Sequence, residues 1–125
     1  MKTTQQFDAI VVGAGPAGSS AALAMARAGL SVALIERGEY AGAKNVSGAA
    51  LYAPGLLADL LPNYWEEAPV ERYLTRRVVT FLSQESALAI DFRTNHFAQP
   101  PYNGFTLLRP KFDRWLAGKA EAAGA

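Results

Sequence analysis

The chain has 125 residues; 50% are hydrophobic and 18% are charged, a composition typical of one small globular domain. Its formal net charge of +1 excludes the basic excess with which a nucleic-acid-binding protein neutralises phosphates. The chain holds no cysteine, so it forms no disulfide, thiolate metal site or iron–sulfur cluster of its own. The polar N-terminus is unlike a signal peptide, and no apolar run approaches the roughly 18 residues of a membrane span. We therefore expect a cytoplasmic chain in which membrane contact is not encoded.

The first three predicted elements form a βαβ unit. Residues 8–12 are a short apolar run ending at a glycine, which favours a buried parallel strand over a helix. Residues 16–28 are rich in alanine and other strong helix formers, and Gly29 follows as a typical helix stop. Residues 30–35 predict a second buried strand, which ends at Glu36. Strand, turn, helix and strand within about 30 residues are typical of this unit.

The rest of the chain predicts loops, a hairpin and two helices. Residues 38–50 lack any periodicity and predict a loop. A short helix is expected over 51–61, with Pro54 near its start. Strands 77–83 and 87–92 then form a hairpin, with Leu88, Ile90 and Phe92 on one apolar face. A loop over 94–104 follows, and after it a helix that Pro110 opens and Gly124 closes. This last helix would place four residues on one apolar face: Phe112, Trp115, Leu116 and Ala120. Asp113 suits the positive end of its first turn.

The turn after the first strand matches the G-x-G-x-x-G pattern of dinucleotide-binding proteins. Gly13 permits the tight turn, Gly15 lets a pyrophosphate approach the backbone, and Gly18 lets the helix pack close to the sheet. Glu36 stands 18 positions after Gly18, near the roughly 20 expected for an acid that binds ribose hydroxyls and repels a 2′-phosphate. Ser19 occupies the position where a P-loop needs lysine, so no ATPase site is expected. This spacing leaves open whether the dinucleotide is FAD or NAD.

Five stretches of the sequence resemble a known family. They are residues 35–38, 42–48, 51–53, 68–72 and 108–116. Together they cover essentially the whole chain, which resembles the FixC family. Proteins of that family are similar to electron-transfer-flavoprotein:quinone oxidoreductases and, more distantly, to geranylgeranyl reductases. The second and the last of these stretches are more specific than the glycine pattern.

The resemblance implies FAD as the cofactor and electron transfer as the activity. Electrons would pass from a reduced electron-transfer flavoprotein to a quinone or a ferredoxin-like protein. The full-length form would be cytoplasmic or peripheral to the inner membrane. The flavin performs the redox chemistry, so no side chain is expected as a catalytic acid or base and no metal is expected. The residues expected to bind the cofactor are Gly13, Ala14, Gly15, Pro16, Ala17, Gly18, Glu36, Arg37, Lys44, Ser47, Gly48 and Arg109.

The expected fold class is therefore α/β: a Rossmann-like FAD-binding βαβ unit with an inserted hairpin and a C-terminal helix. Two parallel strands cover neither their own edges nor both faces of their sheet. We therefore expect residues 1–125 to be the N-terminal part of an FAD/NAD(P)-binding domain that is incomplete. Two alternatives remain at this point: a truncated, non-catalytic dinucleotide-binding module, and an NAD-binding Rossmann domain. His96, the one histidine, is expected to be solvated.

Overall fold

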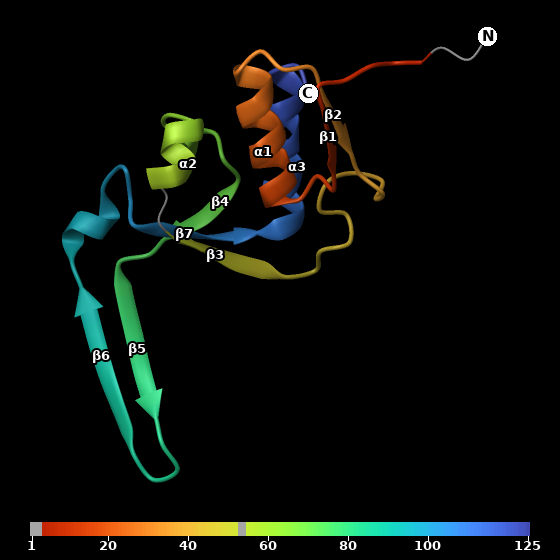
Figure 1. Ribbon diagram of the computed structural model, residues 1–125. Helices are drawn as coiled ribbons and strands as arrows, with labels where there is room; N and C mark the ends of the chain where they lie inside the picture. The colour runs from red at the N-terminus through yellow and green to blue at the C-terminus, as the bar shows by residue number, and fades with distance from the viewer. Residues whose placement is uncertain (1–3, 53–54) are drawn as a thin grey trace.

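The computed structural model describes residues 4–52 and 55–125, and Pro54 lies outside them. The elements are β1 (Ala9–Val12), α1 (Pro16–Arg27), β2 (Val32–Ile35), β3 (Gly48–Tyr52), α2 (Gly55–Leu60), β4 (Val70–Tyr73), β5 (Arg76–Leu82), β6 (Ala87–Arg93), β7 (Gly104–Leu108) and α3 (Arg109–Ala122), with 3₁₀ helices at Tyr64–Glu66 and Asn95–Ala98. Within these residues the strands form three separate sheets, and Figure 1 shows α1 and α3 lying side by side next to the sheet of β1 and β2. Within the described residues, no helix has both the length and the apolar character needed to cross a membrane.

The predicted βαβ unit is confirmed. β1 and β2 pair in parallel, with Ala9 opposite Val32 and Val12 opposite Ile35. α1 connects them, and Gly29 follows it with a φ of +85°, the left-handed conformation that a helix stop requires. The α/β fold class was therefore predicted correctly, and the boundaries of these three elements differ from the prediction by two residues at most.

The second sheet was not predicted. It is antiparallel, in the order β3-β7-β4, and it lies between the βαβ unit and the hairpin (Figure 1). Three sequence expectations were wrong here: residues 48–50 are strand rather than loop, residues 51–52 are strand rather than helix, and Gly104 begins a strand. β4 had no predicted counterpart at all. The strands have only four or five residues, too short for an alternating pattern to be recognised.

The predicted hairpin is confirmed, but its apolar face is not buried. β5 and β6 pair antiparallel from Arg76 opposite Arg93 to Leu82 opposite Ala87. The hairpin projects away from the rest of the molecule (Figure 1), and every residue of both strands is exposed. The face that carries Ile90 and Phe92, which are 56% and 53% exposed, therefore packs against no core.

The core lies between the helices and the antiparallel sheet. It is formed by buried side chains of α1, β2, α3, β7 and the segment around the first 3₁₀ helix: Ala22, Leu23, Val32, Leu61, Tyr64, Phe105, Leu107, Phe112, Leu116 and Ala120. The predicted apolar face of α3 supplies three of these residues, and Trp115 packs against them while partly exposed. The core therefore fixes α3 against α1, and Pro16 at the start of α1 lines one cavity together with Phe112 of the first turn of α3.

Candidate functional site

The glycine-rich turn has the geometry that the sequence pattern requires. Gly13 adopts a φ of +99° and donates its N–H to the carbonyl oxygen of Ile35, 2.7 Å away. A Cβ at Gly18 would lie 1.9 Å from the Gly13 oxygen, so only glycine allows this close packing of helix on strand. At Gly15, no heavy atom of the described chain beyond its neighbours lies within 4 Å of a Cβ position. The backbone at Gly15 is therefore open to a ligand from outside.

Ser19 holds this turn in place. Its side chain is fully buried, and its hydroxyl donates to the carbonyl oxygen of Ala14 at 3.0 Å. Its backbone N–H donates to the carbonyl oxygen of Gly15 at 2.9 Å. From the sequence, Ser19 served only to exclude a P-loop, and its role in holding the turn was missed.

The carboxylate of Glu36 is fixed beside the turn by backbone N–H groups. Ala14 donates to Oε2 at 2.9 Å, and Gly38 donates to Oε1 at 2.7 Å. These hydrogen bonds, with the Gly38 bond the larger cause, lower the pKa of Glu36 below its ordinary value of 4.5, and the positive charge of Lys44 adds to the effect. Because a carboxylate accepts about four hydrogen bonds, the charged group keeps acceptor capacity for two hydroxyls.

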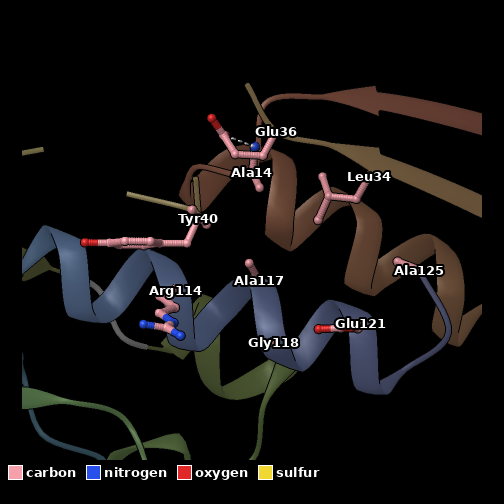
Figure 2. A pocket seen from close by; sticks show the side chains of 10 residues that line it. Ala14, Leu34, Glu36, Tyr40, Arg114, Ala117, Gly118, Glu121 and Ala125 are labelled. Carbon is pink, nitrogen blue, oxygen red and sulfur yellow. Dashed lines mark hydrogen bonds between the residues drawn. The ribbon is translucent and has the colours of Figure 1, made fainter. Parts of the chain in front are cut away.

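An open cavity of about 440 Å³ adjoins Glu36. Figure 2 shows it between the end of β2 with the glycine turn on one side and α3 on the other. Most residues of its walls are small or apolar: Ala14, Leu34, Ala41, Ala117, Gly118 and Ala125. The ring of Tyr40 and the guanidinium of Arg114 lie near one end (Figure 2). The Arg114 guanidinium lies 5.0 Å from the centre of the Tyr40 ring. The volume lies within the range of roughly 300–1,000 Å³ that small-molecule sites have.

These features fit the adenosine and pyrophosphate part of a dinucleotide. The open backbone at Gly15, at the positive end of α1, suits phosphates. The Glu36 carboxylate suits ribose hydroxyls and disfavours a 2′-phosphate by charge repulsion. Among the described residues, no group of three or more histidines, aspartates or glutamates could hold a metal ion.

The other residues predicted to bind the cofactor fall into two groups. Arg37 and Lys44 are exposed near Glu36. Ser47 and Gly48 form the end of the loop and the start of β3, where the Ser47 carbonyl oxygen accepts from the N–H of Arg109 at 3.2 Å. Contacts of these five residues with a cofactor remain predictions.

The side chain of Arg109 forms an ion pair with Asp113, which was not predicted to take part in the site. Its Nε and Nη2 atoms donate to the Oδ1 and Oδ2 atoms of Asp113, each at 2.8 Å, and this raises the pKa of Arg109. Asp113 is fully buried and also accepts from Asn45 Nδ2 at 2.8 Å. From the sequence, only an effect at the helix terminus was expected of Asp113, although its spacing of four residues from Arg109 is typical of a helical ion pair.

Comparison with curated proteins finds relatives at high identity. A protein of Escherichia coli (strain K12), named probable electron transfer flavoprotein-quinone oxidoreductase YdiS, is 52% identical over 96% of this chain. Protein FixC of Azorhizobium caulinodans is 46% identical over 97% of it. The chain spans 28% of the length of each of these relatives. The FixC proteins are the family that the sequence motifs resemble.

Two solved structures share the fold. A geranylgeranyl bacteriochlorophyll reductase-like protein from Thermoplasma acidophilum superimposes with a TM-score of 0.69 at 28% identity, over 95% of this chain and 28% of that one. A myxobacterial chondrochloren halogenase, described as a variant of FAD-dependent halogenases, superimposes with a TM-score of 0.65 at 27% identity, over 94% and 27%. The fold is therefore that of FAD-binding, Rossmann-like proteins.

The family described as FAD dependent oxidoreductase matches residues 8–125, nearly the full chain. FAD, the cofactor on which that family depends, is the one that the sequence resemblance implied. The open glycine turn and the charged Glu36 carboxylate are the parts of the site that such a cofactor needs. This chain belongs to the FAD-dependent oxidoreductase family and is homologous to the FixC and YdiS proteins.

Proposed function

We propose that this chain binds the adenosine diphosphate half of FAD. The observation that carries the proposal is the Glu36 carboxylate, which two backbone N–H groups hold beside the open backbone of Gly15. In that arrangement Glu36 would accept hydrogen bonds from the ribose hydroxyls. The backbone N–H groups of Gly15, Ala17 and Gly18, at the start of α1, would donate to the pyrophosphate.

The remaining predicted residues would complete the site. Arg37 and Lys44 are exposed basic residues near Glu36, and they would add positive charge near the phosphates. Ser47, Gly48 and Arg109 would lie along the part of the cofactor that carries the flavin. Their support is two contacts: the Ser47 carbonyl oxygen accepts from the Arg109 N–H, and α3 packs along α1, which begins at the glycine-rich turn.

The reaction we propose is electron transfer from an electron-transfer flavoprotein to a quinone or a ferredoxin-like acceptor. The support is the name of the E. coli relative, probable electron transfer flavoprotein-quinone oxidoreductase, and the identity of 52% with it. The isoalloxazine of bound FAD would supply the redox chemistry, while the chain's residues bind and orient it. The location we propose is the cytoplasm, with the longer form of the protein at the inner membrane surface.

A titration of the purified chain with FAD tests the proposed binding. FAD fluorescence should change on binding with a saturable isotherm, while FMN, which lacks the adenosine, should bind at least about tenfold more weakly. Glu36→Ala should weaken FAD without altering the circular dichroism spectrum, because the Glu36 side chain is exposed. Equal affinity for FAD and FMN would contradict the proposal. Tight binding of NAD instead of FAD would favour the NAD alternative, and FAD binding without any electron transfer would favour the non-catalytic module.

A further inference from the structure

A buried carboxylate joins two segments that lie far apart in the sequence. The Asp113 side chain has no exposed surface, and three donors satisfy it: two from Arg109, four residues earlier in α3, and one from Asn45 in the loop of residues 42–48. Each of these bonds is 2.8 Å long. A buried charge is costly unless it is paired and hydrogen-bonded, so the arrangement is stable only with its partners present.

The loop is fastened to α3 at two further points. A Cβ at Gly42 would lie 2.9 Å from the Asp113 Cβ and 3.1 Å from the Pro110 Cα, so the loop touches the first turn of the helix there. Gly42 also has a φ of +85°, which disfavours any other residue. At the other end of the loop, the Ser47 carbonyl oxygen accepts from the Arg109 N–H. Asp113 therefore sits midway in a series of contacts that runs along residues 42–48.

The network restrains Arg109 without using up its donors. A guanidinium has five N–H donors, and Asp113 accepts from two different nitrogens of Arg109. The side chain of Arg109 remains 31% exposed. The unused N–H groups of Arg109 are therefore held in one orientation and stay available to an outside acceptor.

We infer that Asp113 is a positioning residue, which fixes Arg109 and the loop of residues 42–48 in one arrangement before FAD binds. The inference rests on the proposed function, because these two segments are the ones expected along the flavin side of the cofactor. A preformed arrangement lowers the entropy lost when loop and side chain are ordered on binding. Asp113 itself would touch no part of FAD.

Two substitutions test the inference, and the chain offers a matched control. Asp113→Asn keeps the size of the side chain but removes its charge; Asn45→Ala keeps the buried ion pair and removes only the bond to the loop. The control is Asp91→Asn, because Asp91 accepts from the Nε and Nη2 atoms of Arg76 in the same two-bonded manner on the exposed hairpin. Asn45→Ala keeps the test informative if Asp113→Asn does not fold.

The readouts are FAD affinity, AMP affinity and hydrogen exchange of the loop in the ligand-free chain. We expect Asn45→Ala to weaken FAD about fivefold, because one bond from an uncharged amide to the carboxylate is lost. Asp113→Asn should weaken FAD about thirtyfold, because the ion pair with Arg109 is lost as well. AMP reports only the Glu36 end, so its affinity should change less than about twofold. Amides of residues 42–48 should exchange faster in both variants and at the wild-type rate in Asp91→Asn.

Unchanged loop exchange in both variants would overturn the inference. Equal loss of FAD and AMP affinity would also overturn it, because that pattern indicates general loss of structure. If the wild-type chain binds neither FAD nor AMP, the proposed function fails for this chain. In that event the exchange rates of the ligand-free loop still decide whether Asp113 fixes it.

Discussion

Gly18→Ala should destabilise the fold, because the new methyl group has nowhere to go. Its carbon would lie 1.9 Å from the Gly13 carbonyl oxygen, 3.1 Å from the Gly13 carbonyl carbon and 3.2 Å from a Val11 methyl carbon. The first of these contacts is roughly 1.5 Å shorter than an optimal non-bonded separation. The clash involves backbone atoms, so no change of rotamer relieves it. α1 must move away from β1.

The size of this effect follows from two opposing contributions. Overpacking of this kind costs about 1–3 kcal/mol, and the upper end applies because helix and strand must separate. Alanine favours the helix over glycine by about 1 kcal/mol, which offsets part of the loss. We therefore expect Gly18→Ala to lower the free energy of unfolding by about 1–2 kcal/mol. For a domain of this size the melting temperature should fall by roughly 5–10 °C.

Gly15→Ala is the matched control, three residues earlier in the same motif. Gly15 has a φ of −71° and an extended ψ, which alanine adopts freely, and the space around its Cβ position is open. Its stability should change by less than about 1 kcal/mol, while FAD affinity should fall more than about tenfold because the methyl group stands where the pyrophosphate must approach. Thermal unfolding by circular dichroism and FAD titration measure the two effects. A Gly18→Ala variant as stable as wild type would refute the packing argument, and a Gly15→Ala variant with unchanged affinity would refute the phosphate argument.

Three other changes have expected outcomes. Glu36→Gln should remove a contribution to stability that depends on the charge of Glu36. Because the pKa of Glu36 is lowered in the folded state, this contribution is present above pH 4.5 and is lost as the pH falls below it. The urea unfolding midpoints of wild type and variant should therefore converge in acid. Tyr64→Phe should stabilise the fold by about 1 kcal/mol, because the Tyr64 hydroxyl is buried without a hydrogen-bond partner among the described residues. Burial raises the Tyr64 pKa from 10.0 to about 12, so the stability of the wild type should fall between these pH values and that of the variant should not. Unfolding free energies that fall in parallel for both proteins over this pH range would contradict this. Phe81→Ser and Ile90→Ser on the exposed hairpin face should change the unfolding free energy by less than about 0.5 kcal/mol and lower self-association in light scattering, whereas a large loss of stability would show that this face is packed.

The βαβ unit and the backbone geometry of its glycine-rich turn could be predicted because their determinants are local. Gly13, Gly15 and Gly18 act on backbone atoms within a few residues of themselves, and the structure shows the close packing at Gly18 and the open space at Gly15. Glu36 was predicted from its distance along the chain, since a strand, a turn and a helix of ordinary length return the chain to the same edge of the sheet. Its two backbone donors then follow from that placement.

The antiparallel sheet and the Asp113 network could not be predicted, because both depend on contacts between distant segments. β7 pairs with β3 across more than 50 residues, and strands this short carry too few side chains for a pattern. Asp113 bonds to Asn45 from 68 positions away. The helical spacing of Arg109 and Asp113 indicates an ion pair, but burial of that pair is decided by the loop that covers it.

In the hairpin, the alternating sequence pattern predicts the strands correctly but does not determine whether their apolar face is buried. Alternation correctly placed Leu88, Ile90 and Phe92 on one face, yet each is more than half exposed. Alternation reports which side chains share a face; what covers the face depends on the tertiary structure. The side chains expected to contact the cofactor differ from this exposed face, because bonds within the chain hold them. Ala14 and Gly38 hold Glu36, and Asp113 holds Arg109, so the expected cofactor contacts are restrained by the chain's own bonds and need little ordering when a ligand arrives.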